Sequence, residues 1–149
     1  MDYQALKNEI ETGPLAGELT GLTDVGITSL LNAPRYTAVA ERFITARTIL
    51  NECGPVAGAA ILDKLEAAAA MSSPLKWAMK FLLSDGIDIG ATSTRAQIDA
   101  LAAAGVLTVD ESKLLQDMAL QPASRAEIAG LGVVTYSDVS RALNGPWEE

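Results

Sequence analysis

The chain has 149 residues and a formal net charge of −8, from 11 basic and 19 acidic side chains. This length fits one domain. The basic residues are scattered singly, whereas a protein that binds nucleic acid needs a basic patch to neutralise phosphates. The sequence contains no histidine, which excludes Ser–His and Cys–His nucleophile pairs and zinc sites built on histidine. The single cysteine, Cys53, is expected to be a small buried hydrophobe.

The composition favours helices and argues against a membrane span. Apolar residues make up 49% of the chain, but many of them are alanine and only 5% of all residues are aromatic. Alanine is the best helix former and buries little area. No run approaches the ~18 consecutive apolar residues of a membrane span, and the opening Met1-Asp2-Tyr3 lacks the pattern of a signal peptide. We therefore expect a soluble helical protein that stays in the compartment where it is made.

Glycine, proline and serine divide the first part of the chain into short helical segments. Gly13-Pro14, Gly54-Pro55 and Ser73-Pro74 are pairs that end one helix or start the next. The expected helices span about residues 3–12, 23–32, 37–53, 55–71 and 75–83. The third of them depends on Thr37 as its cap and on an apolar face of Val39, Phe43, Ala46 and Leu50.

The second part of the chain is expected to be helical as well. Residues 86–90 are predicted to be a loop or a short extended piece. Three capping boxes follow, each a Ser or Thr with Gln or Glu three residues later: Thr94/Gln97, Thr108/Glu111 and Ser124/Glu127. A last helix begins near Ser137 and stops at Gly145-Pro146.

These elements predict an all-α fold, a compact bundle or array of about 7–9 short helices joined by short loops. We expect a single domain over residues 1–149, with residues 145–149 as a tail. A subdivision into residues 1–85 and 92–144 is left open.

Residues 95–111 and 125–138 echo one another. Each begins with Arg-Ala, one polar residue and Ile, then passes through a glycine stop and an apolar step to a new helix cap. Such self-similarity can mark helical repeats, which normally need at least three units. Two imperfect copies leave open both a duplication and a recurrent helix–turn–helix pattern. A DNA-reading role for residues 94–120 is not favoured, because the second helix there would be net acidic.

No catalytic, cofactor-binding or metal-binding motif is found in the sequence. Gly130-Leu-Gly132 lacks the third glycine and the preceding strand of a dinucleotide fingerprint. Asp85 and Asp88 supply too few oxygens for a calcium loop. We therefore expect neither enzyme activity nor a cofactor, metal ion or small-molecule substrate.

Four large apolar side chains are candidates for protein contact. Trp77, Phe81 and Met71 lie on or beside the most apolar predicted helix, and helical spacing places Trp77 and Phe81 on one face. Aromatic residues and methionine are enriched in protein interfaces, but the same three would also serve as core residues. Trp147 lies beyond the last helix stop, where it either folds back on its own domain or anchors in a neighbouring subunit.

Two stretches of the chain resemble a family of phage proteins. The first contains Tyr3-Gln-Ala-Leu6-Lys-Asn-Glu-Ile10, Gly13-Pro14-Leu15, Gly21-Leu-Thr23-Asp24 and Leu30-Leu31-Asn32. The second runs from Ser124-Arg-Ala-Glu127 through Leu131-Gly132-Val133 to Ser137-Asp138-Val139. The pattern is similar to that of small, mostly uncharacterised proteins of tailed bacteriophages and prophages, encoded among virion structural and tail-region genes. Residues 35–92 carry no part of this resemblance.

The resemblance implies a structural or accessory subunit of a virion, in the tail, the tail-fibre attachment or the head–tail connector region. Such a subunit is made in the host bacterial cytoplasm and packs against other virion proteins or against copies of itself as a homo-oligomer. The alternative is a soluble assembly factor or regulatory adaptor that binds one protein partner in the host cytoplasm. In both cases the expected partners are proteins, and neither nucleic acid nor a membrane is involved.

Overall fold

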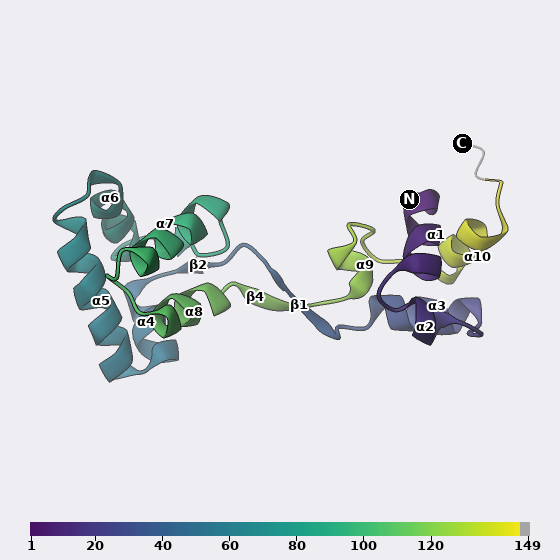
Figure 1. Ribbon diagram of the computed structural model, residues 1–149, viewed down its shortest axis with the longest axis horizontal. Helices are drawn as coiled ribbons and strands as arrows, with labels where there is room; N and C mark the ends of the chain where they lie inside the picture. Colours follow the sequence, from purple (N-terminus) through teal and green to yellow (C-terminus); the bar gives the residue numbers. More distant parts are fainter. Residues whose placement is uncertain (147–149) are drawn as a thin grey trace. The chain divides into compact units, whose positions relative to one another are not determined.

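The computed structural model describes residues 1–146, in which the chain forms ten α-helices and four short strands (Figure 1). The helices are α1 (Tyr3–Thr12), α2 (Ala16–Leu19), α3 (Asp24–Asn32), α4 (Ala46–Cys53), α5 (Pro55–Ala69), α6 (Ser73–Leu82), α7 (Thr92–Ala103), α8 (Val109–Asp117), α9 (Arg125–Ile128) and α10 (Tyr136–Asn144). The strands are β1 (Tyr36–Val39), β2 (Phe43–Ile44), β3 (Ile87–Asp88) and β4 (Leu120–Ala123). The fold is therefore predominantly helical, as expected, but it is not purely all-α.

The chain divides into two compact units, each with a core of its own. Unit 1 comprises Met1–Ala38 and Pro122–Glu149, and unit 2 comprises Val39–Gln121. Unit 2 is thus inserted between the two segments of unit 1. The two connecting segments, β1 and β4, pair with each other as a two-stranded sheet. These boundaries differ from a single domain and from a division between residues 85 and 92, because the C-terminal helices pack with the N-terminal ones.

In unit 1 the two ends of the chain pack together. Helix α10 (yellow) lies beside α1 (purple), and α3 contacts both α9 and α10 (Figure 1). The core side chains come from both segments, and Leu6, Leu31 and Val139 among them are fully buried. Residues more than a hundred positions apart along the chain therefore share one core, which a sequence pattern does not reveal.

Two polar contacts hold the segments of unit 1 together. The guanidinium of Arg125 on α9 forms an ion pair with the buried carboxylate of Glu9 on α1, and their hydrogen bond raises the pKa of Arg125. The amide of Asn32 donates to the carbonyl oxygen of Val134 at 2.6 Å, and the backbone N–H of Val134 donates to the Asn32 amide oxygen at 3.1 Å. Asn32 thereby satisfies both backbone groups of a residue that lies outside any helix or strand.

In unit 2, the consecutive helices α4, α5 and α6 pack in sequence order, and α7 packs against α8. The short strands β2 and β3 are antiparallel, with Ile44 opposite Ile87. Ile44 and Ile61 are fully buried in the core. Gly58 lets α5 approach α4 closely, because a Cβ there would lie 2.9 Å from the Ile49 carbonyl oxygen. Cys53 is half-buried against this core, and burial raises the pKa of its thiol.

The predicted helix that starts at Thr37 is wrong over its first half. Residues 36–39 form strand β1, residues 43–44 form β2, and helix α4 begins only at Ala46. Tyr36, Thr37 and Val39 are aromatic or β-branched, residue types that favour extended backbone. The pairing partners of both strands are distant in sequence: β1 pairs with β4, and β2 pairs with β3. Pairing with strands that are distant in sequence therefore outweighs the helical spacing of the apolar residues in this segment.

Two of the three predicted capping boxes are confirmed. Thr108 caps α8 with Glu111, and Ser124 caps α9 with Glu127. The box predicted at Thr94 is wrong, because α7 already begins at Thr92 and Thr94 lies inside its first turn. The extended piece expected within residues 86–90 is confirmed as strand β3.

The two echoing segments lie in different units. The first supplies α7 and α8 of unit 2, and the second supplies α9 and α10 of unit 1. Leu107 and Val134 are both buried immediately before a threonine that caps the next helix. In contrast, Ile98 is buried whereas Ile128 is 41% exposed. The turn and the cap are therefore shared, but the packing of the preceding helix is not.

Candidate protein-contact surface

Among residues 1–146 there is no group of three or more Cys, Asp or Glu side chains placed to hold a metal ion. The carboxylate of Asp88 instead accepts hydrogen bonds from the backbone N–H of Arg42 at 3.0 Å and of Gly90 at 2.9 Å. Its role in the structure is to fix the turn beside β3. Over the same part of the chain, no helix combines the length and apolar character needed to cross a membrane.

Helix α6 carries apolar side chains on both its inner and its outer face. Ser72 occupies the N-cap position and a proline lies in the first turn, where its missing N–H costs nothing. Leu75, Met79 and Leu82 follow one another at intervals of four and three residues and pack against the core of unit 2. This inner face fixes the orientation of the helix and leaves the opposite face in solvent.

The outer face of α6 presents two aromatic side chains. Trp77 is 54% exposed and Phe81 is 51% exposed, and their spacing of four residues places them one turn apart. Trp77 and Phe81 are therefore not core residues. Met71, in the turn between α5 and α6, is 90% exposed and is likewise outside the core. Trp147, the fourth candidate, lies outside the described residues.

Two lysines accompany the aromatic residues on the outer face. The Nζ atom of Lys80 lies 4.3 Å from the centroid of the Trp77 ring, a cation–π contact. Lys76 lies on the same exposed side, and residues 73–84 include no acidic side chain. We name Lys76, Trp77, Lys80 and Phe81 the α6 face. In an acidic protein this is a local surface that is both basic and aromatic.

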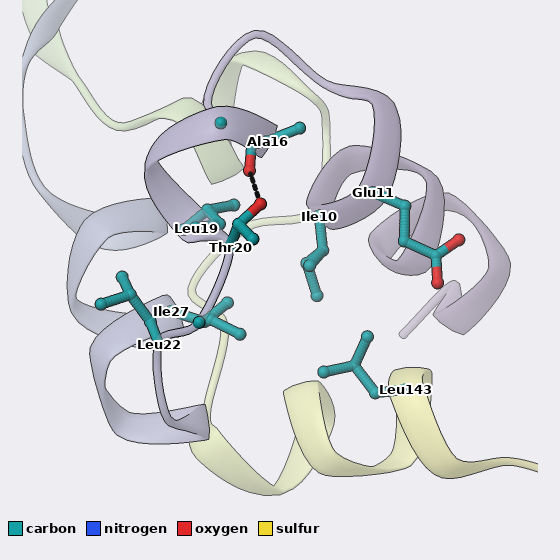
Figure 2. Close-up of a pocket in the computed structure, with 10 residues that line it drawn as sticks. Ile10, Glu11, Ala16, Leu19, Thr20, Leu22, Ile27 and Leu143 are labelled. Atoms are coloured by element: carbon teal, nitrogen blue, oxygen red, sulfur yellow. Dashed lines mark hydrogen bonds between the residues drawn. The ribbon is translucent and has the colours of Figure 1, made fainter.

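Unit 1 contains an open hollow of about 490 Å³ (Figure 2). Its apolar lining includes Ile10, Leu19, Leu22, Ile27 and Leu143. Figure 2 shows Ile10 on α1 and Leu143 on α10 pointing toward one another across the space, with the carboxylate of Glu11 at the edge. Gly17 and Gly21 form part of the wall, and a Cβ at either position would meet nothing within 4 Å.

Sequence reasoning did not find this hollow. Its apolar residues come from segments that are far apart in sequence, and α1 and α10 meet only in the folded chain. The short glycine-containing stretch between Ala16 and Leu22 is the one local signal, since two residues without side chains leave space beside an apolar wall.

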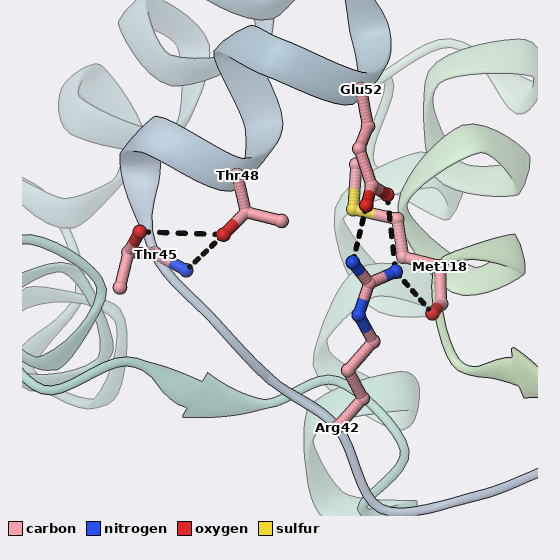
Figure 3. A network of polar contacts seen from close by, with 5 residues as sticks. All are labelled: Arg42, Thr45, Thr48, Glu52 and Met118. Atoms are coloured by element: carbon pink, nitrogen blue, oxygen red, sulfur yellow. Dashed lines mark hydrogen bonds and ion pairs between the residues drawn. The ribbon is translucent and has the colours of Figure 1, made fainter.

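A polar network around Arg42 in unit 2 holds segments of the chain together (Figure 3). The guanidinium of Arg42 forms an ion pair with Glu52 on α4 and donates to the carbonyl oxygen of Met118 at 2.9 Å. The hydrogen bond with Glu52 raises the pKa of Arg42. Nearby, the backbone N–H of Thr45 donates to Thr48 Oγ1 at 3.1 Å and so satisfies a group at the start of α4. Arg42 thus ties the segment before β2 to α4 and to the end of α8.

Comparisons with protein-family models, with curated proteins and with solved structures found no match to this chain. The features of the molecule that bear on its function are the α6 face, the hollow and the sequence itself.

Proposed function

We propose that the protein is a structural or accessory subunit of a tailed-phage virion, in the tail, the tail-fibre attachment or the head–tail connector region. It acts by packing against another protein through the α6 face. The observation that supports this most directly is the exposure of Trp77 and Phe81 on a helix whose opposite face is buried. The placement in a virion is supported by the resemblance of the two end segments to phage proteins.

The α6 face has the properties of a binding surface that needs little reorganisation. Aromatic side chains supply most of the binding energy in many interfaces, because each buries a large area from only two rotatable bonds. Here they project from a helix that is held by its own core contacts, which lowers the entropy lost on binding. Lys76 and Lys80 favour a partner whose contact surface is acidic.

The test is the composition of particles made with altered chains. Replacing both Trp77 and Phe81 by alanine should leave the fold intact, since neither side chain is buried, and should remove the protein from purified virions. The matched control is Val109→Ala, which truncates a side chain that is 79% exposed on α8. Mass spectrometry of purified particles measures both.

Two results would contradict the proposal in different ways. If the unaltered protein is missing from intact particles but co-purifies with one partner from lysate, it is an assembly factor or adaptor. If the doubly substituted protein is incorporated as well as the control, the α6 face is not its contact surface.

A further inference from the structure

We infer that the receptor for the α6 face is the hollow of unit 1 on a second copy of the same chain, so that copies join head to tail. This inference rests on the proposed function, since it names the partner of the α6 face. The two surfaces belong to different units. The hollow is a recess lined in part by leucine and isoleucine side chains, and the α6 face carries exposed aromatic side chains that such a recess can accept.

The hollow offers space for the aromatic side chains of the α6 face. The hollow has a volume of about 490 Å³ and is open to solvent. Its lining includes leucine and isoleucine side chains together with Gly17 and Gly21, which add no side chain of their own. Trp77 and Phe81, one helical turn apart, form a ridge that can enter such a recess, and burying aromatic anchors in apolar pockets is how interface hot spots form.

The charges of the two surfaces are also complementary. The described residues of unit 1, 1–38 and 122–146, contain seven acidic and four basic side chains. Glu11 borders the hollow, and its side chain is 51% exposed. Its ion pair with Lys7 spans 3.9 Å on the surface, a geometry that contributes little. Lys80 on the approaching α6 face can therefore pair with Glu11.

The same charges disfavour the alternative contact between two α6 faces. A symmetric pairing would place Lys76 and Lys80 of both copies together, and like charges placed together across an interface disfavour the contact. Contact between two different surfaces is heterologous, and such contacts produce rings when the rotation closes and open chains when it does not. The inferred contact therefore predicts closed rings of two or more copies or open chains.

Sedimentation velocity over a concentration series tests this on the full chain. The first variant, Trp77→Ala, truncates the α6 face. The second, Gly17→Leu, places a large side chain at the lining of the hollow on α2, where a Cβ would meet nothing within 4 Å. We expect unaltered protein to form oligomers and each variant alone to associate at least tenfold more weakly. Val109→Ala should associate like unaltered protein, and hydrogen exchange should confirm that all variants are folded.

Mixing the two variants gives the sharpest result. The α6 face of the Gly17→Leu copy and the hollow of the Trp77→Ala copy are both intact, so an equimolar mixture should form a 1:1 dimer and nothing larger. Charge reversal gives an independent check: Glu11→Lys and Lys80→Glu should each weaken association, and mixing these two variants should restore it.

Each remaining outcome overturns the inference. Protein that stays monomeric at every concentration, or a Gly17→Leu variant that associates as well as the unaltered chain, shows that the hollow is not the receptor. If replacing both Trp77 and Phe81 by alanine nevertheless removes the protein from purified virions, the α6 face remains the contact surface and only its partner is different. If the doubly substituted protein is also incorporated as well as the control, the α6 face is not the contact surface in the virion either, and that part of the proposed function fails too.

Discussion

The two cores should unfold independently, and a substitution in one should leave the other unchanged. Leu6 is fully buried in unit 1 and Leu115 is 2% exposed in unit 2, and the two belong to separate clusters that share no residue. Leu6→Ala and Leu115→Ala are therefore matched variants, which remove the same atoms from different cores.

The magnitude follows from what each substitution removes. Truncating a buried leucine to alanine loses the transfer free energy of the removed carbons and leaves a cavity, which together cost about 2–5 kcal/mol. A value of ~3 kcal/mol corresponds to about a hundredfold increase in the fraction of unfolded unit, since each 1.4 kcal/mol is about tenfold. Amides that exchange only when their unit opens should exchange faster by about the same factor.

Hydrogen exchange followed by mass spectrometry assigns this change to segments of the chain. Leu6→Ala should accelerate exchange in peptides from residues 1–38 and 122–146 and leave those from residues 40–120 unchanged. Leu115→Ala should give the reverse pattern. If either variant accelerates exchange equally in both sets of peptides, the chain unfolds as one cooperative body and the two units do not unfold independently.

Three further predictions concern local features. Thr108→Ala removes the confirmed cap of α8 and should lower the free energy of unfolding in urea by about 1 kcal/mol. Thr94→Ala, inside the first turn of α7, should lower it much less, and equal effects would contradict the cap assignment. Gly58→Ala should lower the urea midpoint of unit 2, because the added methyl group clashes with the backbone of α4. This overpacking costs about 1–3 kcal/mol, which outweighs the higher helix propensity of alanine. An unchanged or higher midpoint would refute this. The hydrogen bond from Lys64, at 2.6 Å, lowers the pKa of Glu111 below its usual 4.5, so its contribution to stability is present above pH 4.5 and is lost as the pH falls below that value. In thermal unfolding between pH 3 and 6, Glu111→Gln should flatten this acid loss, and an unchanged profile would show that other groups cause it.

The sequence by itself determined the features that depend on neighbouring residues. Gly54-Pro55 separates α4 from α5 as predicted, because glycine ends one helix and proline is tolerated only in the first turn of the next. The caps at Thr108 and Ser124 were also predictable, since each involves a side chain and a backbone N–H three residues apart.

Only the tertiary structure decided which segments pair and which faces are buried. Residues 36–39 are extended because β4, about eighty residues later, supplies their hydrogen-bonding partner. The boundaries of the units depend on α10 packing beside α1. Trp77 and Phe81 are exposed because Leu75, Met79 and Leu82 occupy the inner face of α6, and spacing alone cannot tell which of two apolar faces turns inward. The physical reason is the range of the interactions: caps and stops are settled within one helical turn, whereas burial depends on contacts that form only after distant parts of the chain have come together.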